Sequence, residues 1–305
     1  MPLFLPTATE TDSSQPDLIS DSGASGLGAA RRETEVWLQT LHLYGAAGIA
    51  AFGWAMCRLI GASAKPWLPM WFCSALLLYN VDRLRRDPSD GMNTPLREEA
   101  ARRLRPWSWA LTAVSTAVLF LVPIRRRDWL TLSLTLGGSI VCLNYSVPVR
   151  GFRLKDVPLL KTFFAPTLVI AAVFGLPVLH SLSLVDIKTP ILVLWAWSIL
   201  FSNMVLCDLR DVPGDQSCGV VSVPSHIGPK WTGRLLWTLI ALTGGLGLLL
   251  AHLRPMPSYL WLRLTLASAA YLTALVVAVR KPRSERFYEW CVEGVLFVPA
   301  IVLLF

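Results

Sequence analysis

Charged residues are scarce in this chain, and the residues that usually build zinc or redox sites are scattered. Asp, Glu, Lys and Arg make up 16% of the 305 residues, whereas 54% are hydrophobic. A soluble domain carries about 25% charged residues, so the composition excludes an ordinary soluble protein. The six cysteines form no CxxC pair and the four histidines show no HxxxH spacing, which argues against a transition-metal site.

Long apolar runs recur along most of the sequence instead. A helix needs about 20 mainly apolar residues to cross the hydrocarbon layer of a membrane. We therefore predict an all-α, polytopic membrane protein with about nine transmembrane helices. The expected spans are 37–60, 66–82, 106–124, 129–147, 159–179, 189–207, 232–251, 258–279 and 288–305.

The basic residues indicate how the chain is oriented. The net charge is +8, and most of the 28 Lys and Arg residues fall on the side of the expected spans that the N-terminus shares. The positive-inside rule therefore predicts a cytoplasmic N-terminus and an external C-terminus. We interpret Arg97 and the Arg280–Arg286 cluster as topology determinants. The excess positive charge is thus explained by membrane topology and an anionic ligand, and not by a nucleic-acid surface. The triplet Arg125–Arg127 falls on the opposite side, and the positive-inside rule does not explain it.

The first part of the chain has a different composition. Residues 1–30 are rich in Ser, Asp, Thr, Gly and Pro and lack the apolar core of a secretory signal. We expect residues 1–35 to form a disordered cytoplasmic tail and residues 36–305 to form the membrane domain. With no targeting segment evident, we expect the host membrane to be a bacterial inner (plasma) membrane.

Three aspartates follow the sixth expected span. Asp208, Asp211 and Asp215 stand at i, i+3 and i+7, so a continuing helix would place them on one face, with Arg210 beside them. Carboxylates this close repel one another unless a cation lies between them. Mg²⁺ prefers oxygen ligands and accepts phosphates as partners, so the cluster predicts a magnesium site. The alternative is a solvated loop in which the acids and Arg210 pair loosely.

A second polar cluster ends the second expected span. Asp82 directly follows an apolar run, where an unpaired charge is costly. On a helix, Asp82 lies one turn before Arg86. Asn80, Arg83 and Asp87 share another face of the same helix. The cluster is either a second acidic half of the ligand site or a juxtamembrane segment with local Asp–Arg pairs.

A third polar cluster lies between the fourth and fifth spans. It contains Tyr145, Arg150, Arg153, Lys155 and Lys161, and all three clusters fall at the same ends of the predicted helices. Two groups of acids that face a group of bases suit a diphosphate, which Mg²⁺ bridges to the acids while Lys and Arg bind its oxygens. An apolar tail would lie between the helices, which points to an isoprenoid diphosphate.

These residues resemble the UbiA superfamily of intramembrane prenyltransferases, over about residues 37–305. The DLRDVPGD run from Asp208 to Asp215, with Gly219 and the VPSHIG run that ends at Gly228, is similar to the D-x-R-D-x-x-G-D … G … T-L-P-x-x-x-G run of the family. The YSVP run that starts at Tyr145, with Lys155 and Lys161, is similar to the Tyr- and Lys-bearing loop between the fourth and fifth helices of that family. The resemblance implies nine transmembrane helices, with an Asp-rich motif after the second and another after the sixth.

The first motif departs from the family pattern N-D-x-x-D-x-x-x-D. When Asp82-Arg83 is aligned with the D-R of the family, Leu78 replaces the leading Asn and Arg86 replaces the last Asp. Asp87 lies close enough to substitute as a metal ligand, although Pro88 breaks the helix there. This departure indicates a divergent member, altered chemistry or a loss of catalysis.

The resemblance implies Mg²⁺-dependent transfer of a prenyl group from an isoprenoid diphosphate to a lipophilic or aromatic acceptor within the bilayer. The implied catalytic acids are Asp82, Asp208, Asp211 and Asp215, and the same four with Asp87 are the implied metal ligands. The implied substrate-binding residues are Asn80, Arg83, Arg86, Tyr145, Lys155, Lys161 and Arg210. Tyr145 is also a candidate to stabilise an allylic carbocation through its ring.

Two other functions stay open. An intramembrane terpene cyclase would ionise the same diphosphate and quench the cation within the prenyl chain. A non-catalytic or transport protein would retain the scaffold, and the altered first motif favours it. Glu289 and Glu293 lie one turn apart in the ninth span, but because Glu289 can pair with Arg286 or Arg283 we expect no site role for either acid.

Overall fold

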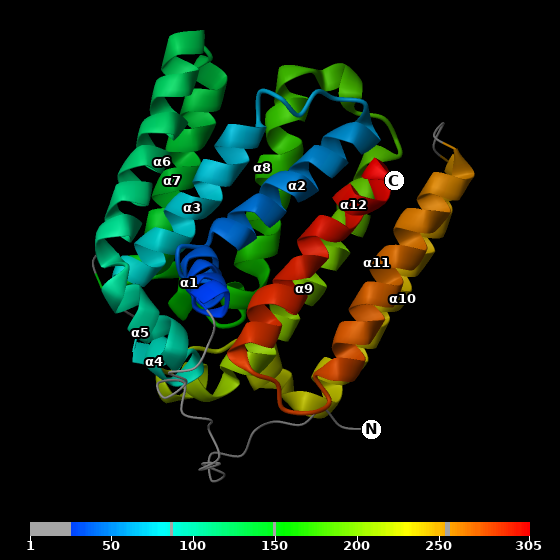
Figure 1. The fold of residues 1–305 in the computed structure, drawn as a ribbon. Coiled ribbons are helices and arrows are strands. Elements are labelled where there is room, and N and C mark those ends of the chain that lie inside the picture. Colours follow the sequence, from blue (N-terminus) through cyan, green and yellow to red (C-terminus); the bar gives the residue numbers. More distant parts are fainter. Residues whose placement is uncertain (1–25, 86–87, 149–150, 254–256) are drawn as a thin grey trace.

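A computed structural model describes residues 26–85, 88–148, 151–253 and 257–305, and the regular elements in these residues are all helices (Figure 1). The elements are α1 (Gly26–Thr40), α2 (Leu43–Ile60), α3 (Leu68–Arg85), α4 (Pro88–Asn93), α5 (Pro95–Arg103), α6 (Arg105–Arg126), α7 (Trp129–Ser146), η1 (Leu154–Asp156), α8 (Leu160–His180), η2 (Leu182–Leu184), α9 (Thr189–Ser217), α10 (Val223–Leu253), α11 (Ser258–Ala278), η3 (Phe287–Val292), η4 (Glu293–Phe297) and α12 (Val298–Leu304).

Seven helical segments are long and apolar enough to cross a membrane. They are α2, α6, α8, α9, α10, α11 and the last segment, Phe287–Leu304. The fold is therefore that of an all-helical integral membrane protein. The other two expected spans, α3 and α7, are helices of 18 residues that pack against α6 and against each other. Polar residues lower their hydropathy: α3 ends in Asp82, Arg83 and Arg85, and Thr, Ser, Gly and Asn interrupt α7.

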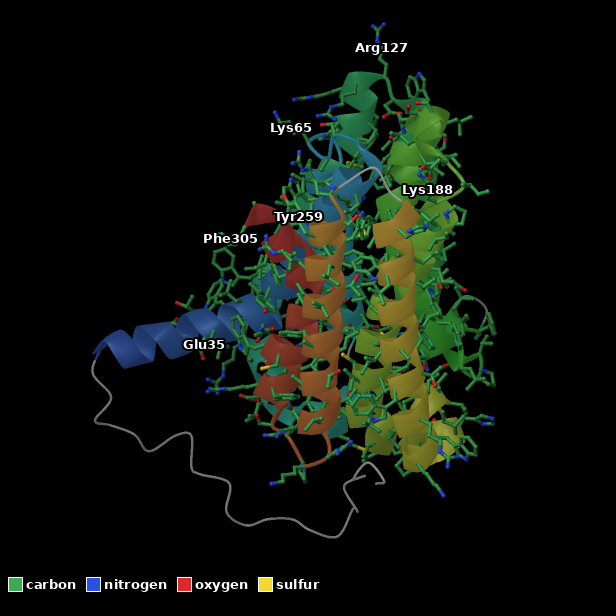
Figure 2. All side chains as sticks on the ribbon, turned by 90° about the vertical axis from the view of Figure 1, so that its right-hand side faces the viewer. Glu35, Lys65, Arg127, Lys188, Tyr259 and Phe305 are labelled. Carbon is green, nitrogen blue, oxygen red and sulfur yellow. The ribbon has the colours of Figure 1, made fainter. Side chains whose placement is uncertain are left out.

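The first expected span, 37–60, is wrong as a single helix. The chain turns at His42, whose φ of 57° is left-handed, and α1 ends there while α2 begins. Residues 26–35, which the sequence assigns to the tail, form part of α1. The ring of Trp37 lies 5.2 Å from that of Trp107 at the start of α6, and this contact anchors α1 against the bundle. Figure 2 shows α1, with Glu35, lying crosswise to the bundle.

Tight packing of α2 against its neighbours forms the centre of the core. Phe52, Met56 and Trp71 are each at most 1% exposed. The indole of Trp71 fills the space where a side chain at Gly53 would stand, so this glycine lets α3 approach α2 closely. The Trp71 Nε1–H also donates to the Ala172 carbonyl at 3.1 Å and so fixes α3 to α8.

The two ends of the bundle differ in character. Figure 1 shows α4, α5, the end of α3 and the end of α9 gathered at one end of the molecule, which we call the polar end. Lys65, Arg127 and Lys188 lie toward the other end (Figure 2). The three polar clusters of the sequence therefore share one end, as predicted, and Arg125–Arg127 lie at the tip of the α6–α7 hairpin, far from them.

Candidate functional site

One cavity opens among the helices at the polar end. Its volume is about 220 Å³, and α2, α3, α7, α8, α9 and η4 surround it, with α4, α5 and η1 at its rim. Walls toward the bundle interior are apolar and include Ile49, Leu168, Met204 and Leu296. Charged side chains line the remaining walls. We call this space the central cavity.

The central cavity follows one face of α9. This helix has 29 residues and continues past the expected end of its span at residue 207 to Ser217. Asn203, Cys207, Arg210, Asp211 and Asp215 all line the cavity, as their spacing of i, i+4, i+7, i+8 and i+12 allows. The second Asp-rich motif is therefore a continuation of the helix, and the alternative of a solvated loop is wrong.

The three aspartates of this motif converge on a single lysine. The Lys161 ammonium lies 2.7 Å from Asp215 Oδ2 and 3.6 Å from both Asp208 Oδ1 and Asp211 Oδ2. Asp208 is fully buried, and its other oxygen accepts a hydrogen bond from Thr162 Oγ1 at 2.5 Å. Lys161 stands in the first turn of α8, and the Leu159 N–H just before it bonds to the Val221 carbonyl at 2.7 Å. The start of α8 is thereby held against the segment that follows α9.

The donor set suits Mg²⁺, but Lys161 stands among the donors. In the residues that the structure describes, no three acidic, histidine or cysteine side chains are grouped so that they share one metal position. The carboxylates nevertheless surround one positive charge, and Asp208 Oδ1 is buried without a hydrogen-bond partner. Hard anionic oxygens around a cation are the ligands that Mg²⁺ selects. A metal ion at this position requires Lys161 to withdraw from the acids.

Asp82 reaches the central cavity from the opposite wall. The Ser146 hydroxyl donates to Asp82 Oδ1 at 2.6 Å, and the Lys155 ammonium lies 3.9 Å from the same oxygen. These contacts join the end of α3 to the end of α7 and to η1. The ring of Tyr145 stacks on Phe164, with centroids 4.3 Å apart, and both rings line the cavity. The structure therefore places Asp82, Tyr145 and Lys155 around the same space as the α9 acids.

The remaining predicted residues divide into three groups. Arg83 and Arg210 line the cavity, and Arg210 Nε donates to Asp211 Oδ1 at 2.7 Å. Asn80 does not line it: its fully buried amide donates to the Leu41 and Leu76 carbonyls and so holds the α1–α2 turn against α3. Arg86 and Asp87 lie outside the described residues.

The loop after the first motif contacts the second motif directly. Asn93, at the end of α4, accepts a hydrogen bond from the Gly214 N–H at 2.9 Å. A side chain at Gly214 would collide with the Asn93 amide, so only glycine fits between the two acids of the DVPGD run. Asn93 was not predicted as a site residue, because nothing in the sequence distinguishes it from other loop residues between the two motifs.

Sequence reasoning also missed a buried charge cluster beside the cavity. Arg97, expected to be only a topology determinant, is 6% exposed and lies 3.7 Å from the Glu289 carboxylate. Its Nη2 lies 3.4 Å from the Gln39 carbonyl and 2.6 Å from His42 Nδ1. The imidazole of His42 stacks on the ring of Tyr79 with centroids 4.4 Å apart. This cluster joins α5, the α1–α2 turn and the last membrane segment.

The His42 side chain makes stability depend on pH. Burial, followed by the positive charges of Arg97 and Arg83, holds the pKa of this imidazole well below its usual 6.5. The unfolded chain therefore binds a proton near pH 6.5 that the folded protein does not. The contribution of neutral His42 to the free energy of unfolding is therefore complete above pH 6.5. It is lost as the pH falls, by at most about 1.4 kcal/mol per pH unit.

We expect the unfolding temperature in detergent to drop between pH 7 and pH 5. His42→Asn, which tolerates the left-handed backbone, will make this drop shallower. His252→Asn at an exposed position of α10 is the control and will leave the slope unchanged. A slope that is the same in wild type and His42→Asn would contradict the assignment.

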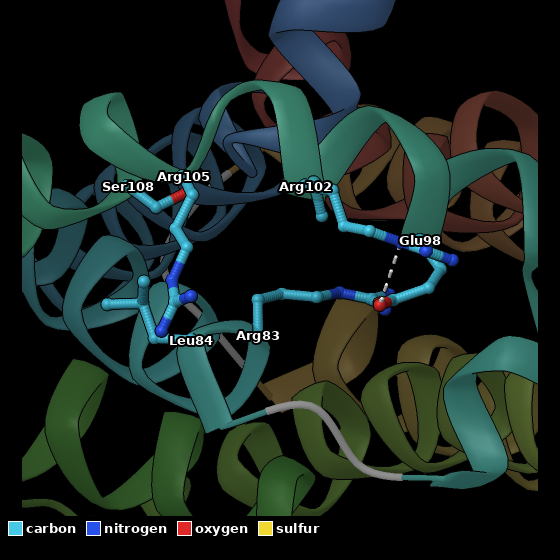
Figure 3. A pocket seen from close by; sticks show the side chains of 7 residues that line it. Arg83, Leu84, Glu98, Arg102, Arg105 and Ser108 are labelled. Atoms are coloured by element: carbon cyan, nitrogen blue, oxygen red, sulfur yellow. Dashed lines mark ion pairs between the residues drawn. The ribbon is translucent and has the colours of Figure 1, made fainter.

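A second pocket at the polar end is too small for a ligand. Figure 3 shows Arg83, Arg102 and Arg105 around it, with the ion pair of 3.7 Å between Arg102 and Glu98. The space amounts to about 10 Å³, roughly that of one water molecule. The central cavity is therefore the candidate site.

Fold and site together define an integral membrane protein whose charged cavity opens at one end of an apolar helical bundle. The chain matches the UbiA prenyltransferase family over residues 79–297, a range that includes both acidic clusters and the whole of α9. The protein belongs to this family. Searches of curated proteins and of solved structures gave no significant match.

Proposed function

We propose that the protein transfers a prenyl group from an isoprenoid diphosphate to an aromatic acceptor within the membrane, in a reaction that depends on Mg²⁺. The observation that carries this proposal is the convergence of three carboxylates and Lys161 at the charged end of a cavity that also has apolar walls. A ligand that fits must combine an anionic head with an apolar body. An isoprenoid diphosphate has this chemistry.

The diphosphate binds at the polar end of the central cavity. Lys155, Lys161, Arg83 and Arg210 line this end and supply positive charge and hydrogen bonds to its oxygens. Asp208, Asp211 and Asp215, with Asp82 across the cavity, would hold Mg²⁺. Bound Mg²⁺ would neutralise negative charge on the diphosphate leaving group.

The prenyl chain extends between the apolar walls. Phe164, Leu168 and Ile49 lie along this part of the cavity and exclude water from an allylic cation. The stacked rings of Tyr145 and Phe164 present aromatic surface to it, which stabilises a cation through its interaction with the ring electrons.

We also propose a membrane arrangement for the bundle. Helices α3 and α7 cross the bilayer with the seven more apolar segments, which gives nine spans. The polar end and the N-terminus face the cytoplasm of a bacterial inner membrane, since most basic residues lie on that side. The site is then open to water-soluble Mg²⁺ and diphosphate, while the prenyl chain stays within the hydrocarbon layer.

Release of diphosphate by the purified protein in detergent tests the proposal. Geranyl, farnesyl and geranylgeranyl diphosphates are supplied with Mg²⁺ or EDTA, with and without phenolic acceptors. We expect release that requires both Mg²⁺ and an acceptor. Release that proceeds without an acceptor would favour a terpene cyclase or a hydrolase, and the lack of release from every donor, longer chains included, would favour a non-catalytic protein.

A further inference from the structure

The last membrane segment brings an acid into the wall of the central cavity. A regular helix does not continue through this segment: η3 (Phe287–Val292) is a π-helix and η4 (Glu293–Phe297) is a 3₁₀-helix. Such irregular turns inside helices occur frequently at functional sites. Glu293 stands where the two meet, and its side chain lines the cavity together with Leu296.

The two acids of this segment have different surroundings. Glu289 is tied to its neighbours through Arg97, at 3.7 Å, and through its carbonyl, which accepts from the Gln39 amide at 3.2 Å. No hydrogen bond or ion pair from the described part of the chain reaches the Glu293 carboxylate. A carboxylate within a membrane segment is costly without a partner, which marks Glu293 as a group that meets a ligand.

The surrounding backbone makes room for this carboxylate. A side chain at Gly45 of α2 would place its Cβ 2.9 Å from Glu293 Oε2, so glycine leaves the space that the acid occupies. Across the segment, Asn203 of α9 donates to the Val292 carbonyl at 2.7 Å and fixes the peptide that precedes Glu293. The acid is thereby positioned between α2 and α9.

The peptide before Glu293 is held at a level of α9 deeper in the bundle than Asp215. Asn203, which holds its segment, precedes Asp215 by twelve residues on the same helix, about 18 Å at 1.5 Å per residue. The charged groups that act on Glu293 are Arg97 of α5, Glu289 of η3, Arg210 of α9 and Arg83 of α3. Arg97 is paired with Glu289 and Arg210 with Asp211, so these two arginines are shared with other acids.

We propose that Glu293 is the base of the transfer reaction and that its acceptor is an uncharged, hydroxylated aromatic ring. This inference rests on the proposed function. The bond between C1 of the prenyl group and the diphosphate oxygen breaks, and its electron pair leaves with the diphosphate. A bond forms between an acceptor ring carbon and C1, and the proton on that carbon passes to the Glu293 carboxylate. A carboxylated acceptor would bring a second negative charge beside Glu293, which the cavity disfavours.

Glu293→Gln tests the role of the carboxylate. We expect kcat for hydroquinone to fall about 100-fold or more, the usual size of a general-base contribution, while KM for the prenyl diphosphate stays unchanged. Ring deuteration of hydroquinone will slow the variant and leave the wild type unaffected, since loss of the ring proton becomes limiting only in the variant. Glu289→Gln is the matched control: it lowers thermal stability but retains kcat.

Two further comparisons separate a base from a structural acid. Gly45→Ala keeps the carboxylate but displaces it, and we expect its kcat to fall at least severalfold while the protein stays folded, because the flexible Glu293 side chain can yield. Hydroquinone will be a better acceptor than 4-hydroxybenzoate for the wild type, and Glu293→Gln will narrow this preference.

The outcomes that overturn the proposal differ from those that overturn the function. A wild-type protein that transfers prenyl groups, with a Glu293→Gln variant whose kcat is unchanged, would overturn the role of Glu293 alone. A preference of the wild type for 4-hydroxybenzoate would overturn the assigned acceptor class. A wild-type protein that releases no diphosphate, although it binds the donor, would overturn both the function and this inference.

Discussion

Asp215→Asn will lower the rate of diphosphate release by about a thousandfold and leave the protein folded in the membrane. Asp215 is 2% exposed and makes the two shortest contacts to Lys161, at 2.7 and 2.8 Å. An amide keeps the shape of the side chain but removes the charge that orients this lysine and that, in the proposed function, would hold Mg²⁺. Folding survives because three carboxylates share one central ammonium, so the loss of one reduces their mutual repulsion.

Asp211→Asn will have an effect of similar size, for the same reason. Asp156→Asn provides the control, since this exposed acid lies at the same end of the bundle but pairs with Arg153 at 2.6 Å, outside the central cavity. It should turn over at the wild-type rate. Turnover by Asp215→Asn within a fewfold of wild type would refute the assignment of the acid cluster as the reactive centre.

The face of α9 could be predicted from sequence because helix periodicity is local. Once the helix continues beyond residue 207, the spacing of Asp208, Asp211 and Asp215 alone places them together, and Lys161 contacts all three. The spacing of the aspartates does not predict which basic residue they contact. Lys161 lies 54 residues from Asp215, and its place in the first turn of α8 depends on a left-handed residue, Leu159, with φ of 67°.

The first cluster shows why a polar residue at a span end is an ambiguous signal. Asn80 and Asp82 are neighbours on α3, but only Asp82 lines the cavity. Asn80 instead bonds to the carbonyl of Leu41, whose helix ends at the His42 turn. A positive φ at a residue other than glycine is uncommon, so the sequence predicted an unbroken helix at this point. In an unbroken helix the Leu41 carbonyl would bond within the helix, and nothing in the sequence indicated that Asn80 would bond to it.

The last segment was misjudged for a different reason. The sequence placed Glu289 and Glu293 on one face of a regular helix and paired Glu289 with Arg283 or Arg286. The ion pair of Glu289 is formed with Arg97 instead, and the π and 3₁₀ turns change the rotation between the two acids. Departures from regular helix geometry arise from tertiary packing and leave no periodic mark in the sequence.

Lys161→Met will have the largest effect on stability. The substitution keeps the apolar stem but leaves Asp208, fully buried, and Asp215, almost fully buried, without the ammonium that both contact. Breaking a buried ion pair by removal of one partner costs about 3–5 kcal/mol. Lys155→Met is the control: Lys155 lies 3.9 Å from Asp82, an acid that is half exposed, so its loss costs less.

Mg²⁺ should restore much of the stability that Lys161→Met loses. In the wild type a metal ion must displace the ammonium from the carboxylates, whereas in the variant no ammonium competes with it. The same Mg²⁺ concentration will therefore raise the unfolding temperature of the variant more.

If the single variant does not fold, the addition of Asp208→Asn removes one buried charge and recovers a protein on which the same titration is made. A variant as stable as wild type would refute the role of Lys161 in balancing the acids. A folded variant that Mg²⁺ does not stabilise would instead show that these carboxylates are not the metal ligands, because the competing cation is then absent and only their own affinity is measured.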